Sequence, residues 1–265
     1  MTDRFPTAAG QRNSGRNALL EIRHLTHRFT DGCTGIQDID LTIDTGEFIV
    51  LAGPNGSGKT TLLKHLNGLL KPSDGDVVLD GVPVMKNLQR ARRMVGMVFQ
   101  DADSQIVGET VWDDAAFGPQ NLALPKPEIT ETVRQALQTV GLAAIADKPP
   151  HLLSGGEKRR LAIAGVLCMR PRIIVFDEPF SNMDYPGTCR VLEQMDKLHR
   201  QGHTLIVATH DLEKVLGHAT RLIILQRGKI VRDGIPKEIA AQAELFGIRV
   251  PCAIRFGREL EIWPN

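Results

Sequence analysis

The chain has 265 residues, of which 42% are hydrophobic, and its 32 lysines and arginines are balanced by 31 aspartates and glutamates. This length accommodates one elaborate α/β domain with a small appendage, and the balanced charge gives no electrostatic reason to expect nucleic acid as the main partner. The longest apolar runs, such as residues 161–169, have about half of the ~20 residues that a membrane-spanning helix needs, so any membrane role is expected to come through a partner. The cysteines are scattered without a CxxC pair, which suits a reducing cytosol and predicts neither a zinc site nor a disulfide framework.

The first part of the chain is expected to form strands. Residues 1–17 are polar, which predicts a flexible tail and not a secretory signal. Apolar and polar residues alternate over 39–43, and a further strand is expected at 19–22, so half-exposed antiparallel strands are predicted. Residues 48–52 form a continuous apolar run, which is typical of a strand in the middle of a sheet covered on both faces. A glycine-rich loop follows, and then a helix is predicted over 60–70, ending at a lysine–proline pair.

Strands and helices alternate over the rest of the chain. We expect strands at residues 76–79, 94–99, 173–176, 203–208, 222–226 and 229–232, and helices at 128–140, 157–169, 187–201, directly after Asp211 and at 236–245. This alternation predicts a mostly parallel sheet. The segment between Gln100 and Pro171 has no strand pattern and predicts a helical subdomain, and residues 247–265 are expected to be a tail.

The first motif that carries chemistry is G-x-x-x-x-G-K-[ST], directly after the apolar run at 48–52 and directly before the predicted helix. Its glycines allow backbone N–H groups to converge on phosphate oxygens, and the helix dipole adds favourable potential. Lys59 is predicted to place its ammonium between the β- and γ-phosphates of ATP, and Thr60 to offer its hydroxyl to Mg²⁺. The alternative, a glycine-rich turn without a ligand, is disfavoured by this context. The residues predicted to bind the nucleotide here are Gly53, Pro54, Asn55, Gly56, Ser57, Gly58, Lys59, Thr60 and Thr61.

A pair of carboxylates follows the apolar run at 173–176. Asp177 ends the expected strand, where it can reach the shell of a Mg²⁺ ion beside the phosphate loop. Glu178 is one residue further, where it can polarise a water in line with the γ-phosphate. An Asp-Glu-Pro sequence alone can merely end a strand, but after a phosphate loop it predicts ATP hydrolysis with Glu178 as the general base.

A second group of small residues begins the helix expected at 157–169. Leu153 is followed by Ser154, Gly155, Gly156 and Glu157, and the free N–H groups of this helix start form a second place for an anion. A glycine pair at a helix start can also serve only as a cap. Followed by a strand and Asp-Glu-Pro, however, this group resembles the signature sequence of ABC ATPases. The resemblance covers nearly all of residues 19–235.

The resemblance implies the fold and the domain organisation. The expected fold class is α/β, a P-loop NTPase of the ABC type, with a mostly parallel sheet core, an antiparallel β subdomain and an inserted helical subdomain. The ATPase domain is expected at 18–235, with the helical subdomain at about 101–170. The flexible tail at 1–17 precedes this domain, and a short C-terminal extension at 236–265 follows it.

The resemblance also assigns site residues. Gln100 matches the Q-loop glutamine, which touches Mg²⁺ and water and senses the membrane partner, and His210 matches the switch histidine that holds the γ-phosphate. Phe29 matches the aromatic residue, often a tyrosine, that stacks on adenine, and Asp184 matches the aspartate of the D-loop. Glu157 stands where the signature usually has glutamine. The predicted catalytic residues are thus Glu178, His210, Lys59 and Gln100, and the predicted magnesium ligands are Thr60, Gln100 and Asp177.

Two histidine pairs and a basic run have simpler interpretations. His24 and His27 are three residues apart in a strand, which places them on opposite faces, and a glycine is expected to end the helix between His199 and His203. Neither pair is predicted to bind a metal ion. The basic run at 158–160 is predicted to be a solvated helix face.

One phosphate loop and one signature imply half of a dimer. In ABC ATPases the signature of one chain closes over the phosphate loop of another, so two ATP molecules lie between two head-to-tail subunits. Both a homodimer and a heterodimer with a related ATPase agree with this sequence.

The stretch 95–122 resembles the Q-loop region of energy-coupling factor ATPases. The resemblance implies a peripheral subunit at the cytoplasmic face of the cell membrane, which powers uptake of a micronutrient such as cobalt or nickel ion or a vitamin. Its implied partners are a transmembrane coupling protein and a substrate-binding membrane protein. The alternatives are an ATPase of an amino-acid or phosphate importer and a non-transport ABC ATPase. Many non-transport ABC ATPases insert a long coiled coil before the signature, and the sequence between Gln100 and Ser154 has no heptad run. The balanced charge also argues against a nucleic-acid partner.

Overall fold

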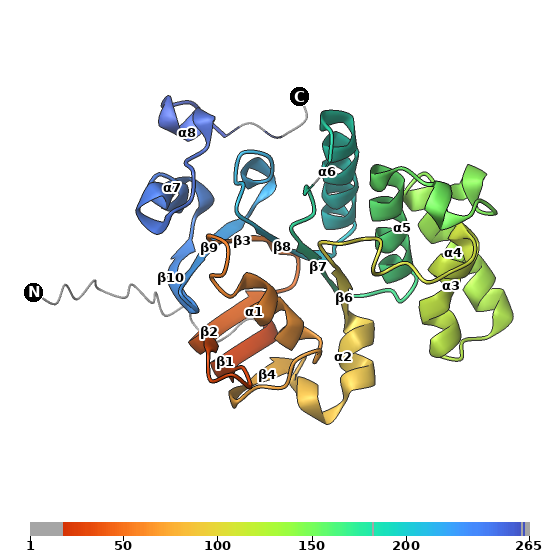
Figure 1. The fold of residues 1–265 in the computed structure, drawn as a ribbon, viewed down its shortest axis with the longest axis horizontal. Coiled ribbons are helices and arrows are strands. Elements are labelled where there is room, and N and C mark those ends of the chain that lie inside the picture. Colours follow the sequence, from red (N-terminus) through yellow and green to blue (C-terminus); the bar gives the residue numbers. More distant parts are fainter. Residues whose placement is uncertain (1–17, 182, 261, 263–265) are drawn as a thin grey trace, which may run out of the picture.

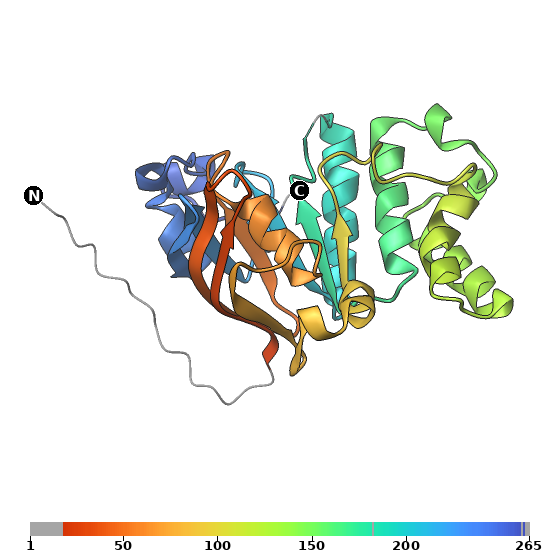
Figure 2. The ribbon, with the colours of Figure 1, turned by 60° about the horizontal axis from the view of Figure 1, so that its bottom comes forward.

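The computed structural model describes residues 18–181, 183–260 and 262, so the tail predicted at 1–17 lies outside the described residues (Figures 1 and 2). Its central feature is a six-stranded sheet in the order β10-β9-β3-β8-β7-β6. All neighbouring pairs are parallel except that of β9 and β10, which confirms the predicted mostly parallel core. The strands are β3 (Phe48–Ala52), β6 (Val95–Val98), β7 (Ile173–Asp177), β8 (Thr204–Thr209), β9 (Arg221–Gln226) and β10 (Lys229–Gly234).

Both faces of this sheet are covered, as the continuous apolar runs predict. On β3, Phe48 and Val50 point into a core shared with the helices, whereas Ile49 and Leu51 point into a core shared with a second sheet. All five residues of β3 are buried for this reason.

The second sheet is antiparallel, in the order β2-β1-β4-β5, with β1 (Ala18–Arg28), β2 (Thr34–Asp44), β4 (Asp74–Leu79) and β5 (Val82–Pro83). Ile39 and Leu41 on β2 are buried, whereas Asp40 between them is exposed, which confirms the half-exposed strand. Helix α1 (Lys59–Leu66) lies between the two sheets, where Leu62 and Leu63 contribute to the second core (Figure 2).

Helices cover the other side and extend to one end of the molecule (Figure 1). The α-helices are α2 (Leu88–Met94), α3 (Val111–Asn121), α4 (Lys126–Thr139), α5 (Gly155–Leu167), α6 (Tyr185–Arg200), α7 (Pro236–Ala240) and α8 (Cys252–Arg255). Short 3₁₀ helices lie at Val84–Lys86, Ala143–Ile145, Pro150–Leu152, Leu216–His218 and Ala243–Phe246. The segment between Gln100 and Pro171 contains α3, α4 and α5 and no strand, as predicted. None of the helices in the described residues combines the length and the apolarity needed to cross a bilayer.

Three local predictions were wrong or incomplete. Helix α1 ends at Leu66 instead of residue 70, because the chain turns at Gly68, whose φ is 70°. Only a 3₁₀ turn follows Asp211 where a helix was expected. The C-terminal segment is more than a tail: it contains α8, and Ile248 and Val250 are buried in the core shared with the helices.

Candidate nucleotide-binding and hydrolysis site

The phosphate loop connects the carboxyl end of β3 to the first turn of α1. Gly56 and Gly58 have φ values of 75° and 103°, a left-handed conformation that disfavours any residue with a Cβ. A Cβ on Gly53 would lie 2.3 Å from the carbonyl oxygen of Leu225 and 2.5 Å from the hydroxyl oxygen of Ser57. Glycine at these positions lets the loop close tightly, as the approach of backbone to a phosphate requires.

The side chain of Lys59 is turned into this loop. Its ammonium donates to the carbonyl oxygens of Gly53 at 2.8 Å and Pro54 at 3.3 Å, and it lies 3.6 Å from Oε1 of Glu178. Burial lowers the pKa of the ammonium, while the carboxylates of Glu178 and Asp177 oppose that shift. A phosphate entering the loop would supply a partner of opposite charge for this buried cation.

Asp177 ends β7 and faces the start of α1. The hydroxyl of Thr60 donates to Oδ2 of Asp177 at 2.7 Å. The other carboxylate oxygen, Oδ1, is buried and has no hydrogen-bond partner among the described residues. Burial raises the pKa of this carboxyl, and the bond from Thr60 opposes the shift. A buried carboxylate oxygen without a partner, next to a hydroxyl, is a donor set that fits Mg²⁺.

Glu178 and His210 contact each other across the ends of β7 and β8. Nδ1 of His210 lies 3.0 Å from Oε1 of Glu178, and the hydroxyl of Thr209 donates to Oε2 at 3.2 Å. Glu178 has a φ of 45°, which is uncommon for a residue with a Cβ and costs roughly 1 kcal/mol or more. Such strain concentrates at functional sites, where it aims a side chain.

Phe29 lies beside the first turn of α1. Its side chain is 42% exposed, and its ring meets the ring of His27 edge-on at a centroid distance of 4.7 Å. A Cβ on Gly35 would lie 2.7 Å from this ring and 3.2 Å from the methyl group of Thr61, so the ring and α1 meet across Gly35. The exposed aromatic surface next to the phosphate loop fits adenine stacking.

Gln100 follows β6, the neighbour of β7 in the sheet. Arg159 on α5 donates to the carbonyl oxygens of Phe99 and Gln100, the latter at 2.6 Å. Arg159 is only 4% exposed, and burial lowers the pKa of its guanidinium while the charges of Asp101 and Asp177 oppose the shift. The structure therefore fixes the backbone of Gln100 to the signature helix through a buried arginine.

The prediction of a solvated basic face was wrong for Arg159. Helix α5 packs against β6 and against α3, α4 and α6, and of the basic run at 158–160 only Arg159 is buried. The neighbouring Lys158 pairs with Asp103, which also lies in the Q-loop. Sequence reasoning thus missed two residues that attach the signature helix to the Q-loop. The signal that could have found them is the uninterrupted apolar run at 161–169, which leaves no polar face for the helix.

The signature begins α5 with a capping box. The hydroxyl oxygen of Ser154 accepts from the N–H of Glu157 at 3.3 Å, and the carboxylate of Glu157 accepts from the N–H of Ser154 at 2.8 Å. The N–H and the hydroxyl of Ser154 both donate to the carboxylate of Glu157 and thereby lower its pKa. Glutamate at the usual glutamine position therefore has a structural role, because a capping box accepts either residue. A Cβ on Gly155 would meet nothing within 4 Å, so the helix start is open.

The D-loop lies beside this helix start. Asp184 caps α6 by accepting from the N–H of Gly187 at 2.9 Å. A Cβ on Gly156 would lie 3.9 Å from the methyl carbon of Met183, so D-loop and signature are neighbours. Asn182, which precedes Met183 and Asp184 in the chain, lies outside the described residues.

The predicted site residues therefore form two groups. One contains the phosphate loop, Phe29, Asp177, Glu178 and His210, and the other contains the signature and Asp184. The strands β7 and β6 lie between α1 and α5, so one chain does not bring the signature to its own phosphate loop (Figures 1 and 2). Neither histidine pair converges on one point: His24 is exposed 2.9 Å from Asp38, whereas the buried His27 packs against the rings of Phe29 and His65. His199 and His203 face different backbone carbonyls.

A phosphate loop at the carboxyl edge of a mostly parallel sheet, with a second glycine-rich helix start held apart in a helical insertion, defines the ABC class of P-loop ATPases. Comparison with known families agrees. The family model described as ABC transporter matches residues 36–181, and the chain belongs to this family of ATP-binding, ATP-hydrolysing subunits.

Particular relatives refine this assignment. The chain is 42% identical over 239 residues to the energy-coupling factor transporter ATP-binding protein EcfA of Methanocaldococcus jannaschii, covering 88% of this chain and 86% of the relative. It is 44% identical over 230 residues to EcfA of Methanococcus maripaludis, covering 86% and 83%.

Solved structures show the same similarity. The structure of cbiO1 from Clostridium perfringens, described as part of the ABC transporter complex cbiONQ, superposes with a TM-score of 0.79 at 35% identity, covering 87% of this chain and 93% of that one. The ATP-binding cassette MJ0796, a dimer bound to ADP and Pi in a post-hydrolysis state, superposes with a TM-score of 0.74 at 28% identity, covering 82% and 98%.

Proposed function

We propose that this chain is the ATP-hydrolysing subunit of an energy-coupling factor importer, which powers uptake of a micronutrient such as cobalt or nickel ion or a vitamin through transmembrane partners. The observation that carries this proposal is the full hydrolysis site together with more than 40% identity to proteins named as energy-coupling factor ATP-binding subunits. The same names favour this class over an ATPase of an amino-acid or phosphate importer.

In the proposed reaction a water attacks the γ-phosphorus of ATP, the bond to the β-phosphate oxygen breaks, and Glu178 takes the proton of the water. Lys59 and the loop N–H groups bind the phosphates, and His210 holds the γ-phosphate. Glu178 is suited to this role because its carboxylate is already oriented by His210 and by Thr209. Pre-organisation of this kind lowers the cost of reaching the transition state.

A Mg²⁺ ion, where bound, would neutralise charge on the phosphate oxygens. Thr60 and Asp177 would hold it, since they form a hydroxyl–carboxylate pair with one buried oxygen to spare. Gln100 is proposed as a third ligand. The backbone of Gln100 is held by Arg159, whose guanidinium donates to its carbonyl oxygen.

The active form is proposed to be a head-to-tail dimer, either with a second copy or with a related ATPase. The separation of the two groups of site residues supports this, because each chain needs a signature from another chain to close over its nucleotide. In such a dimer Ser154–Glu157 and Asp184 would face the partner's ATP. The open helix start at Gly155 agrees with an anion that arrives from outside the chain.

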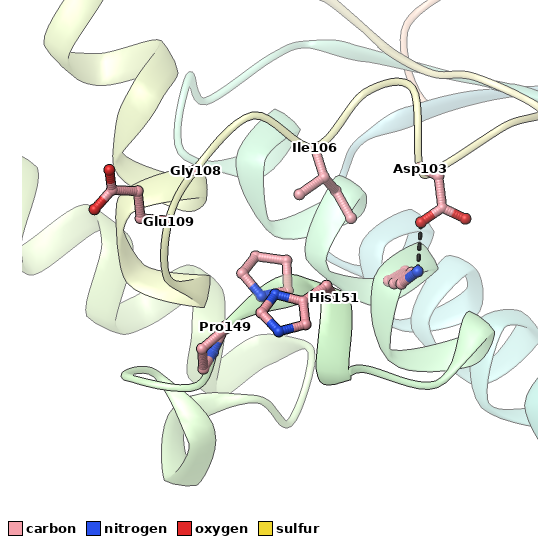
Figure 3. Close-up of a pocket in the computed structure, with 8 residues that line it drawn as sticks. Asp103, Ile106, Gly108, Glu109, Pro149 and His151 are labelled. Carbon is pink, nitrogen blue, oxygen red and sulfur yellow. Dashed lines mark hydrogen bonds and ion pairs between the residues drawn. The ribbon is translucent and has the colours of Figure 1, made fainter.

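A hollow of about 540 Å³ beside the Q-loop is proposed to receive a coupling helix of the transmembrane protein (Figure 3). The hollow lies in the helical segment at about 101–170. We treat this segment as a subdomain of an ATPase domain at 18–235, and the extension at 236–265 follows that domain. Asp103 and Ile106 line one side and Pro149 and His151 the other (Figure 3). Lys158 also lines the hollow and donates to Asp103.

Two exposed apolar side chains, Val107 and Leu152, lie beside this hollow in the sequence, at 60% and 59% exposure. Exposed apolar side chains next to a hollow lined by both apolar and charged residues are suited to an amphipathic helix. The chain would thereby sit at the cytoplasmic face of the membrane without entering it. In a pull-down with native membranes, Val107→Asp should lose the transmembrane partners, whereas Phe117→Asp, a control at an exposed apolar residue of α3, should keep them. Retention of the partners by Val107→Asp would reject this docking site.

The test of the hydrolysis assignment is Glu178→Gln. The variant should bind ATP, accumulate as an ATP-bound dimer in sedimentation, and lack turnover. Hydrolysis by this variant at the wild-type rate would show that Glu178 is not the base. The cargo is identified separately, by purifying the complex from membranes and identifying the bound small molecule or ion.

A further inference from the structure

The C-terminal extension is bonded directly to the segment that carries the switch histidine. The N–H of Cys252, the first residue of α8, donates to Oε2 of Glu213 at 2.8 Å. Glu213 lies three residues after His210, although 39 positions separate it from Cys252. This bond therefore connects two parts of the chain that the sequence does not associate.

From Glu213 a series of hydrogen bonds continues to the catalytic carboxylate. The N–H of Glu213 donates to Oδ1 of Asp211 at 3.1 Å, and the N–H of Asp211 donates to the hydroxyl oxygen of Thr209 at 3.1 Å. The hydroxyl of Thr209 in turn donates to Oε2 of Glu178 at 3.2 Å. Thr209 is only 1% exposed, so its bond to Glu178 lies where solvent does not compete. The series runs without a gap from the extension to the proposed base.

Packing also holds the extension near the segment that follows His210 and near the phosphate loop. Ile248 and Val250 are buried in one core with Leu212 and Val215 of the switch segment. Where the extension turns at Gly247, a Cβ would lie 4.0 Å from Cγ of Pro54 in the phosphate loop. The extension thus contacts the segments that flank the nucleotide on both sides.

We infer that the extension is a positioning element for ATP hydrolysis, and that Glu213 and the N–H of Cys252 fix the orientation of the switch segment and, through Thr209, of Glu178. Cys252 and Glu213 are positioning residues and touch no reacting atom. The inference rests on the proposed role of Glu178 as the base. It also gives a route by which a partner that displaces the extension would slow turnover.

The test removes one hydrogen bond in two independent ways. Cys252→Pro deletes the N–H at the first position of a helix, where proline is tolerated, and the preceding Pro251 already has a ψ of 142°, which suits a residue before proline. Cys252→Ala keeps the N–H and loses only the thiol, so it is the matched control. Glu213→Ala removes the acceptor, and Glu213→Gln keeps an acceptor oxygen.

We expect Cys252→Pro and Glu213→Ala each to lower kcat by about threefold to tenfold with KM for ATP unchanged. The double variant should be no slower than either single one, because both remove the same bond. Cys252→Ala and Glu213→Gln should retain the wild-type kcat. A merely structural role would instead lower the Tm of Cys252→Pro and Glu213→Ala and leave their kcat unchanged.

The inference is overturned if Glu213→Ala turns over ATP as fast as wild type, or if its effect and that of Cys252→Pro multiply. If Cys252→Pro does not fold, the comparison of Glu213→Ala with Glu213→Gln decides on its own. Absence of turnover in the wild-type chain with its partners would instead count against the proposed function, so the two failures are distinguishable.

Discussion

Replacing Arg159 with methionine should loosen the Q-loop and destabilise the chain. Methionine keeps the unbranched shape of the buried stem but cannot donate to the carbonyl oxygens of Phe99 and Gln100. Both carbonyls directly follow β6. Without the guanidinium they lose a hydrogen-bond donor at the point where the chain leaves the sheet. The prediction is that residues 99–108 exchange their amide hydrogens faster in Arg159→Met than in the wild-type chain.

The size of the effect follows from the burial of this arginine, which is 4% exposed. Each hydrogen bond from a charged donor contributes ~1.5–3 kcal/mol. Removing the buried guanidinium also recovers part of its desolvation cost, the cost that lowers its pKa. The net loss in the free energy of unfolding is therefore about 2–4 kcal/mol.

Urea unfolding of Arg159→Met, wild type and the control Arg160→Met measures this difference. Arg160 is the next residue on α5, is half-buried, and its Nε has no hydrogen-bond partner among the described residues, so its loss should cost less than about 1 kcal/mol. Equal unfolding free energies for the two variants, or unchanged exchange over 99–108, would refute the role given to Arg159.

Three further predictions concern the phosphate loop and the helix behind it. Gly53→Ala should abolish ATP binding, since its methyl group would lie 2.3 Å from the carbonyl oxygen of Leu225; retained binding in equilibrium dialysis would show that the loop can relax. Thr60→Val should raise the Mg²⁺ concentration needed for half-maximal ATPase activity, whereas Thr60→Ser should not, because serine keeps the hydroxyl that bonds to Asp177. His65 is 1% exposed and burial lowers its pKa, so the folded chain binds fewer protons there than the unfolded chain and stability falls as pH drops below about 6.5. The free energy of unfolding of wild type, relative to that of His65→Phe, should therefore fall from pH ~7.5 to pH ~5. A difference in urea unfolding that does not change with pH would contradict the assignment.

The phosphate loop, the carboxylate pair and the signature were predictable because each depends on local backbone chemistry. A loop that must adopt φ values near 75° and 103° needs glycine, and the sequence shows glycine at both positions. The capping box of Ser154 and Glu157 likewise depends on only four consecutive residues. The period of the apolar residues distinguished the half-exposed β2 from the fully buried β3, because side-chain direction alternates along a strand.

Contacts between distant segments were not predictable in this way. Arg159 sits in a basic run whose composition is typical of a solvated surface, and only the packing of α5 against β6 and three helices shows that it is buried. The C-terminal segment resembles a tail in sequence, because its helix is a single turn and its apolar residues have no clear period.

The sequence by itself predicted the class of chemistry, from the types and spacing of Gly53–Thr60, Asp177 and Glu178 and from the family resemblance that assigns His210. Only the tertiary structure decided how these residues are oriented. The bonds of Thr60 to Asp177, of His210 to Glu178 and of Cys252 to Glu213 each join elements that no local pattern relates. Local rules act over a few residues of chain, whereas the site is formed where the strands of the sheet end together and the helices behind them close the core.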